Sequence, residues 1–303
     1  MAPTRLIPST GLSIAVREHT PPGPDRATVV LVHGYPDQQE MWDPLVDRLE
    51  RASGGSLHLV TYDVRGAGAS GVPEATRDYR TELLVDDLCA VLDAVLPAGG
   101  RAHLVGHDWG SVQLWDAVTT EATDPRLHGR IASFTSISGP SLDHTAWLAR
   151  HPRGRRLRLL RQALHSTYVA AFQVPVLPDL AWRHLHPAIG RLVAAQERLG
   201  GGHWGPELGR NAAHGLGLYR ANVPIRPTAT EARKRGRELP HTDVPVLVIR
   251  PVHDHYLTAL ILEDLDLICG EVRVQEVDGG HWVARTDPDT VAAHVLEHVR
   301  AHP

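Results

Sequence analysis

The pentapeptide GHDWG at residues 106–110 directly follows the apolar run 102–105. A short apolar run, then glycine, a central nucleophile and a second glycine, is typical of a sharp strand-to-helix elbow that pushes the central side chain into a pocket. A carboxylate there suits displacement at an sp3 carbon, which gives an alkyl ester that water must then cleave. Asp108 could instead cap the following helix, because aspartate is favoured at helix N-caps. The nucleophile hypothesis therefore depends on partner groups elsewhere.

Hydrolysis of such an ester needs a base, and the chain has 20 histidines, so position must select among them. His281 follows two glycines just past the last expected strand, at the carboxyl end of the sheet, where sites in such folds lie. For the acid that orients this base we select Asp254, which follows the preceding expected strand. Three other carboxylates remain as alternatives: Asp143, Asp264 and Asp266.

Backbone donors for a developing oxyanion are predicted in two loops. The sequence HGYP at 33–36 follows an apolar run, and its glycine permits a tight turn that points the N–H of Tyr35 at an oxyanion. An ordinary strand-to-helix turn would explain the same residues. The N–H of Trp109, directly after the candidate nucleophile, is the second predicted donor. Adjacent residues point in different directions at an elbow, so we expect His107 to be a buried support.

The elements that must position these residues follow from the hydrophobic pattern. Short runs rich in Val, Ile and Leu alternate with amphipathic stretches, which predicts a mostly parallel sheet flanked by helices. Buried strands are expected over 28–32, 57–62, 102–105, 131–136, 244–249 and 272–277. Residues 12–17 alternate in polarity and predict part of an antiparallel hairpin. Helical spacing over 84–95 predicts an amphipathic helix, and Asp287-Pro288 predicts the start of the last helix.

The strand pattern stops between about residues 140 and 240. A gap of that length is too long for a structureless loop in a compact domain, so it predicts a helical subdomain. We therefore predict a core domain over 1–139 and 241–303, with a helical cap over 140–240. The cap contains the basic stretch RGRRLR at 153–158, which could touch a membrane or an anionic partner. Leucines among the arginines favour a helix with one solvated face.

Composition narrows the function classes. With 303 residues, 42% of them hydrophobic, the chain can hold one large α/β domain plus an insertion, and a net charge of -4 argues against general nucleic-acid binding. Cys89 and Cys269 lack metal-site spacing and are expected to be small buried apolar residues. The N-terminus lacks a signal-peptide pattern and no apolar run reaches membrane-spanning length. We expect a cytoplasmic protein without a stable membrane anchor, and the oligomeric state is left open, a homodimer included.

Taken together, the motifs resemble an α/β-hydrolase of the epoxide hydrolase branch along essentially the whole chain. The matching segments are HGYP at 33–36, DVRGAGAS at 63–70, GHDWG at 106–110, Asp254 and GHW at 280–282. The order nucleophile, acid, histidine is also that of the α/β-hydrolase fold. The resemblance implies this α/β fold: a mostly parallel central sheet flanked by helices, with the helical cap inserted after the sixth strand.

Epoxide hydrolases of this family place two cap tyrosines over the nucleophile. One usually stands four residues before a Phe-Gln-x-Pro sequence, as Tyr168 does here before FQVP at 172–175, and the other precedes Arg-x-Asn, as Tyr219 precedes RAN at 220–222. Core packing would explain either tyrosine singly. Opening an epoxide generates an alkoxide, and a phenol with a pKa near ~10 can hydrogen-bond the oxygen and donate a proton.

The resemblance thus implies a cofactor-independent and metal-independent epoxide hydrolase whose partners are a small apolar epoxide and water. Asp108 would attack a ring carbon while Tyr168 and Tyr219 hold the oxygen, and His281, oriented by Asp254, would activate water for ester hydrolysis. Three further residues are expected in the substrate pocket: Pro36, Phe172 and Trp282.

Two alternatives stay open. Haloalkane dehalogenases share the same frame, and the indole N–H of Trp109 could bind a halide. However, Tyr35 stands where many dehalogenases carry an asparagine, and the fluoroacetate-specific enzymes usually have arginine at the position of Trp109. The other alternative is a hydrolase-like fold that only binds a small ligand.

Overall fold

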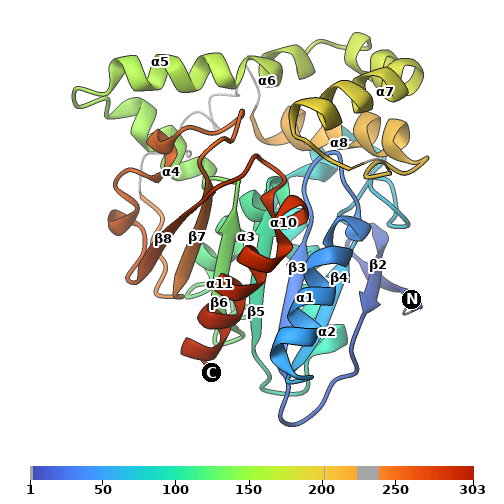
Figure 1. The fold of residues 1–303 in the computed structure, drawn as a ribbon, viewed down its shortest axis with the longest axis vertical. Helices are drawn as coiled ribbons and strands as arrows, with labels where there is room; N and C mark the ends of the chain where they lie inside the picture. Colours follow the sequence, from blue (N-terminus) through green and yellow to red (C-terminus); the bar gives the residue numbers. More distant parts are fainter. Residues whose placement is uncertain (1–2, 201, 224–238) are drawn as a thin grey trace.

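Eight strands form one sheet in the computed structural model of the protein, which describes residues 3–200, 202–223 and 239–303 (Figure 1). Their order is β1-β2-β4-β3-β5-β6-β7-β8. The β1–β2 and β2–β4 pairs are antiparallel, and every pair from β4–β3 onward to β7–β8 is parallel. The strands are β1 Thr4–Ser9, β2 Leu12–Glu18, β3 Ala27–Val32, β4 Leu57–Tyr62, β5 Ala102–His107, β6 Ile131–Ile137, β7 Val246–Pro251 and β8 Val272–Val277. The expected mostly parallel sheet with an antiparallel entry hairpin is confirmed.

Helices cover both faces of the sheet because its central strands are apolar on both sides. In β3, Val30 and Val32 contribute to the core beneath α2 and α3, whereas Val29 and Leu31 contribute to the core beneath α1 and α11. The flanking helices are α1 Asp43–Ser53, α2 Thr81–Val95, α3 Trp109–Thr120, α10 Val283–Thr286 and α11 Pro288–Ala301. Four short 3-10 helices, η1 Gln39–Trp42, η2 Thr76–Tyr79, η3 Ala259–Leu262 and η4 Leu265–Leu267, lie in the connections.

Two predicted helices form as expected. The apolar face of α2 is buried, and the side chain of Asp287 caps α11 by accepting a hydrogen bond from the N–H of Thr290 at 3.2 Å. Two strand boundaries differ slightly from the prediction. β5 continues to His107 rather than ending at residue 105, and β7 starts at Val246 rather than at residue 244. Cys89 and Cys269 are buried free thiols, as predicted.

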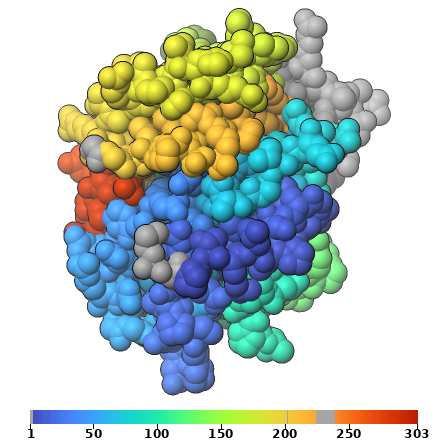
Figure 2. All heavy atoms as spheres, turned by 90° about the vertical axis from the view of Figure 1, so that its right-hand side faces the viewer, coloured from blue at the N-terminus to red at the C-terminus, as the bar shows by residue number. Residues whose placement is uncertain are grey.

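Among the described residues between β6 and β7 there are five α-helices, which we call the helical insertion: α4 Leu142–Arg150, α5 Arg156–His165, α6 Thr167–Phe172, α7 Leu177–Gln196 and α8 Leu208–Asn222. They form a layer over one edge of the sheet (Figure 1), and Figure 2 shows their yellow and orange surface resting on the blue and cyan core. The predicted basic stretch at 153–158 straddles the start of α5. Residues 224–238, which the sequence places in the cap, lie outside the described residues.

Within the described ranges, no helix is both long enough and apolar enough to cross a bilayer. The same residues contain no group of three His, Cys, Asp or Glu side chains that could hold a metal ion.

Candidate active site

Asp108 occupies the turn between β5 and α3 with φ of 51° and ψ of −120°, a backbone conformation that L-residues rarely adopt. Such local strain is typical of functional positions. The two glycines of the pentapeptide make the turn possible. A Cβ at Gly106 would lie 2.6 Å from backbone atoms of Ser111, and a Cβ at Gly110 would overlap the carbonyl of Val32. The predicted elbow is therefore present.

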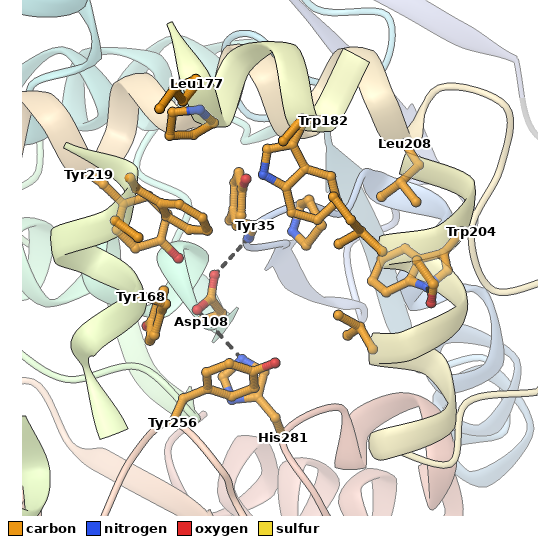
Figure 3. A pocket seen from close by; sticks show the side chains of 18 of the residues that line it. Tyr35, Asp108, Tyr168, Leu177, Trp182, Trp204, Leu208, Tyr219, Tyr256 and His281 are labelled. Atoms are coloured by element: carbon orange, nitrogen blue, oxygen red, sulfur yellow. Dashed lines mark hydrogen bonds and ion pairs between the residues drawn. The ribbon is translucent and has the colours of Figure 1, made fainter. Parts of the chain in front are cut away.

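The Asp108 carboxylate is held from two sides (Figure 3). Its Oδ1 accepts a hydrogen bond of 2.7 Å from the N–H of Tyr35, and its Oδ2 lies 3.5 Å from Nε2 of His281. A Cβ at Gly34 would overlap the carboxylate, so this glycine permits the close approach. The N–H of Trp109, the other predicted oxyanion donor, opens α3, and the first N–H groups of a helix have no intrahelical acceptor.

His281 and Asp254 lie in the loops that follow β8 and β7, as the sequence predicted. Nδ1 of His281 donates to Oδ2 of Asp254 across 3.0 Å, which leaves Nε2 facing Asp108. Oδ1 of Asp254 accepts the N–H groups of Tyr256 at 2.8 Å and Leu257 at 3.1 Å. Burial alone would raise the pKa of Asp254, but His281 and these backbone donors bring it below the ordinary value.

Two carboxylates decide the protonation state of His281. Burial by itself lowers the pKa of the imidazole, but the charges and hydrogen bonds of Asp254 and Asp108 outweigh burial and raise it to about 10. At neutral pH the resting imidazole is therefore protonated. His107 is a buried support, as predicted: its Nε2 donates to the carbonyl of His281 at 2.9 Å, and burial lowers its own pKa to about 4.

The pH dependence of His281 gives a first test. The stability contributed by its imidazolium is complete below 6.5, the ordinary histidine pKa, and is lost as the pH rises through about 10. Histidine side-chain NMR should show His281 protonated at neutral pH, and Asp108→Asn should lower its pKa by removing one charge and one hydrogen-bond partner. A wild-type pKa near 6.5 would contradict this electrostatic picture.

The two predicted cap tyrosines converge above Asp108. Tyr168 comes from α6 and Tyr219 from α8, and their ring centroids are 5.9 Å apart (Figure 3). Burial raises the pKa of both hydroxyls, and the nearby charge of Asp108 raises it further, so both remain protonated donors. The ring of Trp109 packs edge to face on that of Tyr219, with 5.0 Å between their centroids. Hydrogen bonding with the Trp109 indole lowers the pKa of Tyr219, against the larger effect of burial.

These groups line a cavity of about 560 Å³ whose walls are largely apolar. The predicted pocket residues Pro36, Phe172 and Trp282 all line it, together with Asp108, His281, Tyr35, Tyr168 and Tyr219. Trp109 is absent from the lining formed by the described residues, so its side chain reaches the site through Tyr219. Much of the remaining wall comes from α7, including Leu177, Trp182 and Val193.

Tyr256 also lines the pocket, beside Tyr35, Tyr168 and Tyr219, and sequence reasoning missed it. Its ring centroid lies 4.7 Å from that of His281 and 5.4 Å from that of Tyr168, and burial raises its pKa. Its place two residues after Asp254 was the available signal. Its ring therefore packs directly on the imidazole of the proposed base.

A buried carboxylate, Asp37, was also missed. Its Oδ2 accepts a hydrogen bond of 2.6 Å from the indole of Trp282, and its Oδ1 lies 3.1 Å from Nε2 of His203 in the helical insertion. Burial would raise the pKa of Asp37, but His203 and Trp282 hold it below the ordinary value. Asp37 therefore fixes a wall residue next to the base, and it joins the core to the insertion.

Comparisons with known proteins identify the family of the chain. A family model described as alpha/beta hydrolase fold matches residues 27–288. The "Probable oxidoreductase EphD" of Mycobacterium tuberculosis is 35% identical over 302 residues, covering 96% of this chain and 48% of that protein. The chain thus spans about half the length of this relative.

Two further similarities extend over nearly all of both partners. "Epoxide hydrolase A" of Mycobacterium tuberculosis is 31% identical over 338 residues, covering 98% of this chain and 97% of that protein. A Bacillus megaterium epoxide hydrolase in complex with an inhibitor shares the fold, with a TM-score of 0.76 and 18% identity over 98% of this chain and 100% of that one. The chain therefore belongs to the α/β-hydrolase superfamily, in the epoxide hydrolase family.

Proposed function

We propose that this protein is an epoxide hydrolase that opens a small apolar epoxide to a vicinal diol through a covalent ester on Asp108. One observation carries the proposal above the others. Two protonated phenols, Tyr168 and Tyr219, lie over a carboxylate that is itself aligned with His281 and Asp254 (Figure 3). When a carboxylate opens an epoxide, the displaced oxygen stays attached to the substrate and needs a proton. Proton donors on the side opposite the nucleophile can supply it.

In the first step, a carboxylate oxygen of Asp108 forms a bond to one ring carbon, and the bond from that carbon to the epoxide oxygen breaks. The oxygen takes a proton from the tyrosine pair. His281, whose resting form is the imidazolium, can then return a proton to the tyrosine that lost one. The step leaves a hydroxyalkyl ester and a neutral imidazole. Loss of the charge on Asp108 also lowers the pKa of His281, which favours the neutral form.

In the second step, His281 Nε2 removes a proton from water, and the resulting hydroxide attacks the carbonyl carbon of the ester. Asp254 stabilises the imidazolium that forms. The N–H of Tyr35, already 2.7 Å from Oδ1 of Asp108, and the N–H of Trp109 are the proposed donors to the oxyanion. Collapse of this intermediate releases the diol and restores the carboxylate and the protonated histidine.

The helical insertion acts as a cap in this proposal, with the predicted boundaries of 140–240. It supplies both tyrosines, and α7 supplies much of the apolar wall that excludes water from the first step. Steric closure of this kind strengthens the electrostatic interactions at Asp108.

The tyrosine pair provides the test that is specific to an epoxide. Tyr168→Phe/Tyr219→Phe should lower the rate of epoxide opening by about 10²-fold or more, whereas each single variant loses less because the other phenol can still donate. The measurement is single-turnover kinetics with styrene oxide and, in parallel, release of bromide from a matched bromoalkane.

Tyr79→Phe is the matched control, since Tyr79 is buried in the core and does not line the cavity. Full activity of the double variant on the epoxide would refute the role of the pair. Bromide release that is independent of the tyrosines, without epoxide opening, would instead establish a dehalogenase.

A further inference from the structure

Helix α5 exposes its apolar face to solvent, whereas an ordinary surface helix buries it. Leu157, Leu160 and Leu164 share one face, and they are 82%, 58% and 63% exposed. Gln162 is buried instead: its Nε2 donates to the carbonyl of Tyr256 at 2.9 Å, while its Oε1 accepts the N–H of Thr258 at 2.8 Å. Helices that cover a core normally turn their apolar stripe inward. The leucines of α5 are therefore accessible to a binding partner.

Helix α7 also exposes apolar residues. Figure 1 shows α5, α6 and α7 as the outermost layer of the helical insertion, on the side away from the sheet. Four leucines of α7 are exposed by 46% or more: Leu177, Leu180, Leu185 and Leu192. Single exposed apolar residues are normal, but a set of this size within one layer of helices points to an interaction site. We call the exposed leucines of α5 and α7 the leucine face.

Positive charge accompanies the leucine face. Residues 140–223 contain eleven arginines and four acidic residues, although the whole chain carries a net charge of -4. Four exposed arginines on α5 and α7 form no salt bridge in the part of the chain that the structure describes: Arg156, Arg161, Arg183 and Arg191. Leucines flanked by arginines on surface helices are typical of segments that lie in the interface of an anionic bilayer.

The cavity reaches the same surface. Val174 and Leu177 line the pocket that contains Asp108, and they are also 42% and 68% exposed. Figure 3 shows Leu177 at the far side of the cavity from His281. The rim of the pocket is thus part of the leucine face, so a molecule leaving a bilayer would meet the pocket directly.

We propose that the leucine face docks on an anionic lipid bilayer and that apolar epoxides enter the cavity from that bilayer. The part concerning epoxides rests on the proposed function, whereas the docking itself does not. A second copy of this chain is the less suitable occupant. A two-fold interface would place the unpaired arginines of one copy against those of the other, which costs electrostatic free energy.

Vesicle binding tests the docking without any catalysis. The wild type should sediment with phosphatidylcholine–phosphatidylglycerol vesicles and much less with phosphatidylcholine alone. Arg156→Gln/Arg161→Gln should reduce the partition coefficient on the anionic vesicles by about tenfold or more. Leu157→Gln/Leu160→Gln/Leu164→Gln should reduce it at least as much. Leu6→Gln is the matched control, because Leu6 is 63% exposed on β1, away from the leucine face.

Activity then separates this proposal from the proposed function. The leucine variant should hydrolyse dissolved styrene oxide at the wild-type rate but lose turnover of a long-chain epoxide supplied in vesicles. Vesicle binding that is absent, or unchanged in the leucine variant, would overturn the docking even if epoxides are hydrolysed. A wild type that is a dimer in solution, and becomes a monomer on leucine substitution without binding vesicles, would assign the face to a second copy.

A second inference rests on an independent observation, the buried carboxylate of Glu197 at the end of α7. Its Oε2 accepts the N–H of His281 at 2.9 Å, and its Oε1 accepts from Nδ1 of His255 at 2.9 Å. A Cβ at Gly280 would lie 2.6 Å from Oε2, so this glycine makes the approach possible. Glu197 therefore joins the helical insertion to the loop of the base and, through His255, to the loop of Asp254.

We infer that Glu197 is a positioning residue that holds the His281 backbone in register with Asp108. Its effect must pass through His281, since Glu197 does not line the cavity formed by the described residues. The 3.5 Å separation between Nε2 of His281 and Asp108 depends on where this backbone sits. Loss of the contact should therefore slow ester hydrolysis, for which His281 is the base, more than substrate binding.

Glu197→Ala should lower kcat by about tenfold or more while kcat/KM, which reports ester formation, changes little, and it should shift the His281 side-chain NMR signal. Glu197→Gln should recover much of kcat, because an amide oxygen can still accept the N–H of His281. Glu207→Gln is the control, an exposed acid of the same insertion. A Glu197→Ala variant that unfolds at lower temperature but keeps kcat and the His281 signal would leave Glu197 a purely structural role.

Discussion

Replacing Asp108 by asparagine should reduce epoxide turnover by at least about 10³-fold, because an amide oxygen cannot replace the carboxylate as a nucleophile. Asparagine also tolerates the φ of 51° at the elbow, whereas the alanine of Asp108→Ala would bear more strain there. Asp108→Ala should abolish turnover as well. The measurement is kcat on an aryl epoxide, accompanied by thermal unfolding of each variant.

Asp243→Asn is the matched control, since the side chain of Asp243 is 90% exposed and lies far along the chain from the elbow. It should leave both kcat and the unfolding temperature unchanged. Substantial activity in a folded Asp108→Asn protein would refute the covalent route. It would leave His281 free to act directly on water and epoxide, and the mechanism would then need no ester.

The fold and much of the candidate site could be predicted because the relevant signals are local in sequence. A glycine-bounded elbow, a short apolar strand and a loop after that strand each occupy fewer than about ten residues. Parallel strands bring their carboxyl ends to one edge, so Asp108, Asp254 and His281 had to meet once the strands were placed. The tyrosines of the insertion followed from family resemblance, not from any periodicity around Tyr168 or Tyr219.

The residues that sequence reasoning missed depend on contacts between distant segments. Glu197 lies at the end of α7, and its contact with the His281 backbone appears only when α7 is packed against the loop of His281. Asp37 pairs with His203, which comes from the helical insertion. A single sequence gives no indication of which helix face meets which loop. The leucines of α5 show the same limit, because their spacing predicts a stripe but not the direction in which it faces.

Replacing the proposed base, His281→Gln, should separate the two chemical steps. Glutamine can still donate to Asp254, but it cannot take a proton from water, so the ester on Asp108 should form and then persist. Intact-protein mass spectrometry after incubation with an aryl epoxide should show an adduct with the full mass of the epoxide. Digestion should place it on the peptide that contains Asp108.

The same sample distinguishes the leaving groups. An epoxide adds its whole mass because its oxygen stays attached, whereas a bromoalkane would add only its alkyl group, since bromide departs. An adduct from the bromoalkane alone would identify a dehalogenase on this frame, and the tyrosines would then have another use. Failure of both compounds to label Asp108 would contradict the covalent mechanism for these substrates. An adduct from the epoxide that hydrolyses as fast as in the wild type would remove His281 from its proposed role, because some other group would have to activate the water.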